Sequence, residues 1–145
     1  MNFHEDLVIK SSPTGSNYIC NPPVTTTDID TVFLVTNMFF ADQALVANGW
    51  TRCIGEGYEV LGGDFQAYRK GNKNYICTAD PQYYSKYVRA TKICKMMNLL
   101  NKEDRIWMFK VVMEGTHLPS NSLNPTTTPA LNVAANPVQP KYYLA

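Results

Sequence analysis

The chain has 145 residues, of which 45% are hydrophobic and 17% are charged, and its formal net charge is +1. This length and this apolar content predict one globular domain with a core of its own. The nearly balanced charge excludes a protein that is basic throughout, so contact with nucleic acid stays uncertain and would need a local patch of cations. No apolar run approaches the roughly 18 residues that cross a bilayer, and we expect no membrane segment.

The cysteines and the N-terminus indicate a cellular compartment. Four cysteines are spread along the chain without a Cys-x-x-Cys motif, and only two histidines accompany them, so a zinc site is not expected. Cys77 and Cys94 lie in apolar periodic segments, which is typical of buried free thiols. The N-terminal ten residues lack the long apolar core of a signal peptide. We therefore expect a protein of the reducing cytoplasm.

The first half of the chain predicts strands and one short helix. A short apolar run at residues 7–9 predicts a strand, and the composition of residues 11–16 predicts a turn. The continuous apolar run that ends the segment 29–35 predicts a central strand buried on both faces. A short helix is expected over residues 41–48, ended by Gly49.

The second half predicts a hairpin and two helices. Residues 65–69 and 74–78 flank a turn that contains Gly71, as in a β-hairpin. Asp80 followed by Pro81 is a strong helix start, and this helix should run to about residue 99. Asn101 can cap a further helix that stops at Gly115. The four cations of the first of these helices, Lys86, Arg89, Lys92 and Lys95, form either a basic surface or an ordinary solvated face.

The composition changes at residue 118. Five of the nine prolines follow this point, together with several Thr and Asn residues, one lysine and no acidic residue. Such a segment cannot build a packed core by itself. We therefore expect a domain over residues 1–117 and an extended tail over residues 118–145, which is a candidate docking segment for a partner protein.

Two closely spaced carboxylates carry the chemical signal of the sequence. Asp28 and Asp30 are two residues apart at a strand entry, so their side chains should point to the same face. Carboxylates this close repel one another unless a cation lies between them, and Mg²⁺ is the cation that combines carboxylates with substrate phosphates. Upstream, Gly15 allows a phosphate to approach the backbone, and Ser16 offers a hydroxyl. The alternative is an ordinary turn followed by two exposed carboxylates.

Taken together, these residues resemble the signature of the polymerase-β-like nucleotidyltransferases, in particular the small nucleotidyltransferase-like proteins encoded by tailed bacteriophages. An isolated Gly-Ser … Asp-x-Asp pattern would be weak evidence for the family. Here several short sequence blocks further along the chain also resemble the family and occur in its order. The resemblance covers about residues 7–115 and rests on these blocks: Thr14-Gly15-Ser16, Cys20-Asn21-Pro22-Pro23, Thr27-Asp28-Ile29-Asp30, Tyr68-Arg69-Lys70-Gly71, Asn74-Tyr75-Ile76, Tyr87-Val88-Arg89-Ala90-Thr91 and Leu99-Leu100-Asn101-Lys102-Glu103-Asp104-Arg105.

The resemblance implies an α+β fold, with a small mixed sheet and flanking helices, and a metal-dependent transfer of a nucleotidyl group from a nucleoside triphosphate to an acceptor that stays unknown. Asp28 and Asp30 would be the catalytic and metal-binding residues, with two Mg²⁺ ions in the active enzyme. Gly15 and Ser16 would hold the triphosphate. Arg69 and Lys70 are the cations that we expect at its phosphates, because of their charge and their place beside the hairpin.

One position departs from the family pattern. The superfamily adds a third carboxylate on a neighbouring strand, and the matching position here is Asn72, which cannot act as a base. Glu59, Asp64 and Asp80 are the substitutes that the sequence offers. The alternative functions are therefore a catalytically degenerate phage protein that binds or inhibits a partner, and a virion-associated structural protein held by its tail. Both agree with a host cytoplasmic or virion-associated location.

Overall fold

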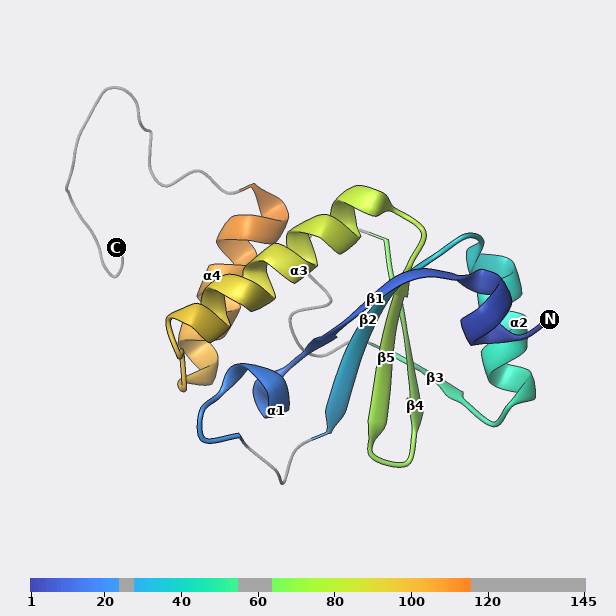
Figure 1. The fold of residues 1–145 in the computed structure, drawn as a ribbon, viewed down its shortest axis with the longest axis horizontal. Helices are drawn as coiled ribbons and strands as arrows, with labels where there is room; N and C mark the ends of the chain where they lie inside the picture. The colour runs from blue at the N-terminus through green and yellow to red at the C-terminus, as the bar shows by residue number, and fades with distance from the viewer. Residues whose placement is uncertain (24–27, 55–63, 116–145) are drawn as a thin grey trace. The chain divides into compact units, whose positions relative to one another are not determined.

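The structure is a computed structural model that describes residues 1–23, 28–54 and 64–115 (Figure 1). Residues Met1–Glu114 form one compact unit, the first of two into which the chain divides. The tail expected over residues 118–145 lies outside the described residues, as does Glu59. No helix in the described ranges is long and apolar enough to cross a membrane.

A five-stranded mixed sheet forms the centre of the first unit. Its spatial order is β1-β2-β5-β4-β3, and only β2 and β5 run parallel to each other. The strands are β1 (Val8–Thr14), β2 (Ile29–Val35), β3 (Thr51–Cys53), β4 (Gln66–Lys70) and β5 (Lys73–Thr78). The expected α+β fold with a small mixed sheet and flanking helices is therefore confirmed.

Among the described residues, five helical segments accompany the sheet. They are the π-helical turn η1 (Phe3–Leu7), α1 (Ser16–Ile19), α2 (Met38–Ala47), α3 (Pro81–Met96) and α4 (Lys102–Glu114). The predicted start of α3 is confirmed, because the Asp80 side chain accepts a hydrogen bond from the Gln82 N–H at 2.9 Å and Pro81 opens the helix. Asn37 caps α2 by accepting from the Phe40 N–H at 2.9 Å.

The sheet is covered on both faces, so its strands are buried between two apolar layers. Figure 1 shows α3 and α4 on one side of the sheet, with η1 and α2 on the other. Val32 and Leu34 pack in the cluster that contains α3 and α4, whereas Phe33 and Val35 pack with η1 and α2. This alternation within one strand confirms that β2 is an internal strand buried on both faces.

Tertiary pairing changes several predicted boundaries. β1 extends to Thr14, because the turn-like residues from Ser11 onward pair with β2. The helix expected to begin at residue 41 begins at Met38, since Asn37 supplies a cap that we had not recognised. β3 was missed because three residues carry too little periodicity to indicate a strand. The hairpin turn lies at Gly71 and Asn72, with a φ of +63° at Gly71 as two-residue hairpins require.

The four thiols provide a test of this packing. Cys20, Cys77 and Cys94 are buried and Cys53 is partly exposed. Burial raises the pKa of Cys94 to about 11 and raises the pKa of Cys77 as well. We expect one thiol, that of Cys53, to react with Ellman's reagent in the native protein at pH 8, and the other three to react only on unfolding. Cys53→Ser should remove the fast phase, and a second fast thiol in the native protein would contradict the fold.

Candidate functional site

The turn that follows β1 lies directly against Asp30. Thr14, the last residue of β1, is the pairing partner of Asp30 on β2, so the next residue, Gly15, passes the aspartate side chain. Gly15 has a φ of +80°, and a Cβ atom at this position would lie 2.8 Å from Asp30 Cγ. Only glycine allows this approach, because any other side chain would meet the carboxylate in a strained backbone conformation.

The Gly15 turn is held in place by α1 and α3. The Gly15 carbonyl accepts a hydrogen bond from the Ile19 N–H at 2.9 Å, which starts α1. Thr14 Oγ1 lies 2.8 Å from Thr91 Oγ1, and Thr91 donates to the Tyr87 carbonyl at 2.9 Å. Because the only hydroxyl proton of Thr91 is used there, Thr14 is the donor in the first bond. This buried chain of hydroxyl bonds fixes the end of β1 to α3.

A row of polar residues crosses the sheet at this point. Thr14 pairs with Asp30, Asp30 with Asn74, and Asn74 with Arg69. Directly paired residues share one face of a sheet, so all four side chains lie on the same face. This is the face of α3, because Val32, two residues beyond Asp30, packs in the α3 cluster. The register thus brings three distant segments of the chain to one surface.

Asp28 joins this row through an ion pair. Arg69 Nη1 donates to Asp28 Oδ2 at 2.6 Å, and the two side chains are 44% and 41% exposed. Asp28 raises the pKa of the Arg69 guanidinium, mainly through this hydrogen bond. Exposed ion pairs contribute only about 0–1 kcal/mol, so Asp28 can exchange its cationic partner at little cost.

Lys70 is separated from the other predicted site residues. It neighbours Arg69 on β4, so its side chain points to the opposite face of the sheet. There Lys70 Nζ donates to the Asn48 carbonyl at 2.7 Å, at the end of α2. The prediction from charge and proximity in the sequence ignored the two-residue period of a strand, which places neighbouring residues on different faces.

Asn74 occupies the position next to Asp30, and we did not identify it from the sequence. The predicted position, Asn72, lies exposed in the hairpin turn, where its carbonyl accepts from the Ile29 N–H at 2.8 Å. Asn74 is the residue of β5 that pairs with Asp30. Its amide oxygen can serve as a weak ligand but cannot remove a proton. The signal that would have found Asn74 is the register of β2 on β5, which no local pattern contains.

Two of the three acidic substitutes are described, and both lie at the other end of β5. Thr78 Oγ1 donates to the Asp64 carbonyl at 2.7 Å and accepts from the Asp80 N–H at 3.1 Å. Thr78 is four residues beyond Asn74, a distance of about 13 Å along a strand. Asp64 and Asp80 therefore do not complete a site around Asp30.

Among the described residues at this end of the sheet, Asp28 and Asp30 are the two carboxylates that could hold a metal ion. Within residues 1–23, 28–54 and 64–115, no three residues of the types His, Cys, Asp and Glu are grouped so that they could hold a metal. A pair of carboxylates suits Mg²⁺, which completes its octahedral shell with water and phosphate oxygens. Asp28 and Asp30, on one face at the entry to β2, fit this requirement.

Comparison of the chain with protein-family models, with curated proteins and with solved structures finds no match.

Proposed function

We propose that this protein is nucleotidyltransferase-like and binds a nucleoside triphosphate, together with Mg²⁺, at the polar row on the α3 face of the sheet. One observation supports this proposal above the others: the turn at Gly15 lies against the Asp30 carboxylate. A phosphate-binding turn and a metal-binding carboxylate must be close together for one triphosphate to use both. An ordinary turn followed by unrelated surface carboxylates does not require this proximity.

Each residue has a role in the proposed complex. Asp28 and Asp30 would hold Mg²⁺, which would supply charge neutralisation for the phosphates and, with two ions in an active enzyme, activation of the acceptor hydroxyl. The glycine at position 15 leaves room for the Asp30 carboxylate beside the turn, and the Ser16 hydroxyl can donate to phosphate oxygens. Arg69 neutralises Asp28 in the free protein. With Asp28 engaged at a metal ion, the Arg69 guanidinium would be free to bind a phosphate.

Transfer of the nucleotidyl group is the activity that the resemblance implies, and Asn74 favours a second candidate. An amide opposite Asp30 leaves the described site without a third carboxylate to deprotonate an acceptor. The second candidate is thus a degenerate member that binds nucleotide without transfer and acts on a partner protein. Glu59, outside the described residues, or a residue of a partner would have to supply the base for transfer.

Calorimetric titration tests the binding site directly. Each nucleoside triphosphate is titrated into the protein with and without Mg²⁺, and then into the Asp28→Asn/Asp30→Asn variant. We expect binding that requires Mg²⁺ and is weakened at least about 100-fold in the variant, since each of the two lost carboxylates should cost about 1.5–3 kcal/mol. Asp64→Asn is the matched control, because it removes a carboxylate at the far end of β5 and should bind like the wild type.

Two outcomes separate the candidates and one contradicts both. Pyrophosphate release from the bound triphosphate would establish transfer or hydrolysis, and Mg²⁺-dependent binding without release would establish the degenerate form. Binding of the double variant with unchanged affinity would contradict the proposed site. Circular dichroism spectra of all variants must match the wild type, so that loss of binding reports the site and not unfolding.

A further inference from the structure

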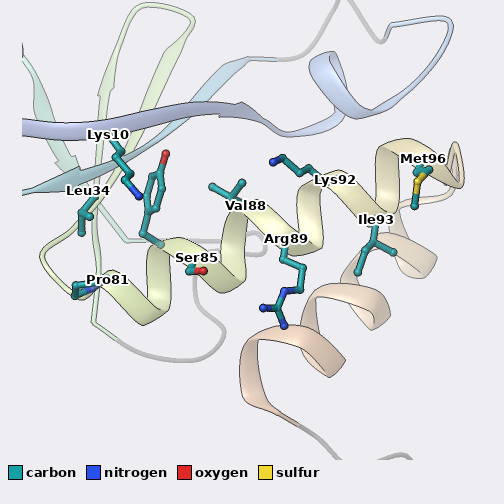
Figure 2. Close-up of a pocket in the computed structure, with 10 residues that line it drawn as sticks. Lys10, Leu34, Pro81, Ser85, Val88, Arg89, Lys92, Ile93 and Met96 are labelled. Atoms are coloured by element: carbon teal, nitrogen blue, oxygen red, sulfur yellow. The ribbon is translucent and has the colours of Figure 1, made fainter.

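The face of α3 that adjoins β1 forms a second surface of interest, away from the Asp28 and Asp30 site. A hollow of about 440 Å³ lies over this face and reaches Lys10 on β1. Figure 2 shows Val88 and Lys92 extending from α3 on the side of β1, and Arg89 on the side of α4. The hollow therefore has cations on two sides and apolar side chains between them.

Among the described residues, the three cations of this hollow have no acidic partner in an ion pair. Lys10 pairs with Leu34, which packs in the α3 cluster, so Lys10 points to the α3 face. Within the described residues the ion pairs join other cations, and none involves Lys10, Arg89 or Lys92. Lys95 of the same helix differs, because its amine donates to the Tyr18 carbonyl at 2.8 Å and lies over the Tyr18 ring.

The sequence of α3 explains this concentration of positive charge. Between Pro81 and Met96 the helix has four cations and no acidic residue. Helices on a protein surface commonly balance their cations with Glu or Asp one turn away, which α3 does not do. The unbalanced charge is available to a ligand of opposite charge.

Apolar side chains form the rest of the surface. Met96 is 82% exposed, and Val88 and Ile93 line the hollow with it. Methionine is flexible and polarizable, so it adapts to partners of different shape. An exposed apolar strip flanked by cations matches a ligand that has both acidic and apolar groups.

We propose that this hollow is a docking site for an acidic, partly apolar segment of a partner protein. The lining extends along α3 from Pro81 to Met96, which corresponds to about 22 Å of helix. An extended segment of about seven residues spans this length. Its acidic side chains would pair with Lys10, Arg89 and Lys92, and its apolar side chains would cover Val88 and Met96.

Other occupants fit the surface less well. The chain's own segment 118–145 has no acidic residue, so it lacks the complementary charge. A bilayer is planar and cannot fill a hollow, and a nucleic-acid backbone has no apolar groups to cover Val88 and Met96. An acidic peptide segment satisfies both the charge and the apolar strip.

Peptide selection on the full-length protein tests this proposal. A random dodecapeptide display library is selected against the protein, and the enriched sequence is labelled and titrated by fluorescence anisotropy. We expect enriched peptides to combine Asp or Glu with large apolar residues. Arg89→Glu and Lys92→Glu should each weaken binding about five-fold or more, because each replaces an attraction with a repulsion. Met96→Gln should weaken it about three-fold through the loss of apolar contact.

A matched variant separates a local effect from a change in net charge. Lys102→Glu alters the total charge as much as Lys92→Glu does, on an exposed residue of α4 outside the hollow. It should leave peptide affinity unchanged. Failure to enrich acidic peptides, or equal weakening by Lys102→Glu, would overturn the proposal. Tighter binding of poly-uridine RNA or of phosphatidylserine vesicles than of any peptide, with the same dependence on Arg89 and Lys92, would overturn it in favour of those ligands.

Discussion

Replacement of Gly15 by alanine is expected to lower the free energy of unfolding by about 2–4 kcal/mol. The φ of +80° costs a residue with a Cβ atom about 1–2 kcal/mol, and the new methyl group would lie 2.8 Å from Asp30 Cγ. Either Asp30 moves or the turn moves, and both changes disturb the proposed nucleotide site. Urea denaturation followed by circular dichroism measures the loss.

Two further variants identify the cause of this loss. Gly71 also has a positive φ, of +63°, but a Cβ atom there would meet nothing within 4 Å. Gly71→Ala should therefore cost only the backbone strain of a positive φ, about 1–2 kcal/mol. In an Asp30→Ala background, which removes the Cγ and Oδ2 atoms, Gly15→Ala should cost little more than Gly71→Ala. An equal cost of Gly15→Ala with and without the Asp30 side chain would contradict the close approach.

The largest effect on stability is expected at Phe109. Its side chain is fully buried, and its ring packs edge-on against Tyr87 with 5.0 Å between centroids. Phe109→Ala would remove this contact between α4 and α3 and leave a cavity, at a cost of about 3–5 kcal/mol. This is a large fraction of the 5–15 kcal/mol that is usual for a whole domain.

Trp107 on the same helix is the control for Phe109. It is 45% exposed, so Trp107→Ala removes a larger side chain with a smaller loss of burial, and we expect a cost below about 1 kcal/mol. If Phe109→Ala does not fold, Phe109→Leu keeps most of the volume and should cost about 1–2 kcal/mol, still more than Trp107→Ala. Similar costs at the two positions would show that α4 is not packed as described.

The ion pair between Asp28 and Arg69 should couple the binding of metal to the binding of nucleotide. Asp28 and Arg69 form an ion pair in the free protein, so Mg²⁺ alone would have to compete with a guanidinium for Asp28, one of its two proposed ligands. A triphosphate brings its own negative charge and offers Arg69 a new partner. We therefore expect metal and nucleotide to bind together, each tightening the other, as the proposed titrations would reveal.

The sequence by itself determined the elements with strong local signals. Asp80 and Pro81 started α3, the apolar run of β2 identified an internal strand, and Gly71 identified the hairpin turn. These signals are local because capping, burial on both faces and a positive φ each depend on a few adjacent residues. The placement of the Asp28 and Asp30 side chains on one face also followed from the sequence, because side chains alternate between faces along a strand.

Only the tertiary structure decided which residues meet. The register of β1 on β2 placed Gly15 against Asp30, and the register of β2 on β5 placed Asn74 rather than Asn72 beside it. The pleat of β4 directed Arg69 toward Asp28 and Lys70 away from it. Register is set by the sum of contacts between segments far apart in the chain. A shift of one residue moves every side chain of a strand to the opposite face of the sheet. For this reason no local sequence pattern could predict the register of these strands.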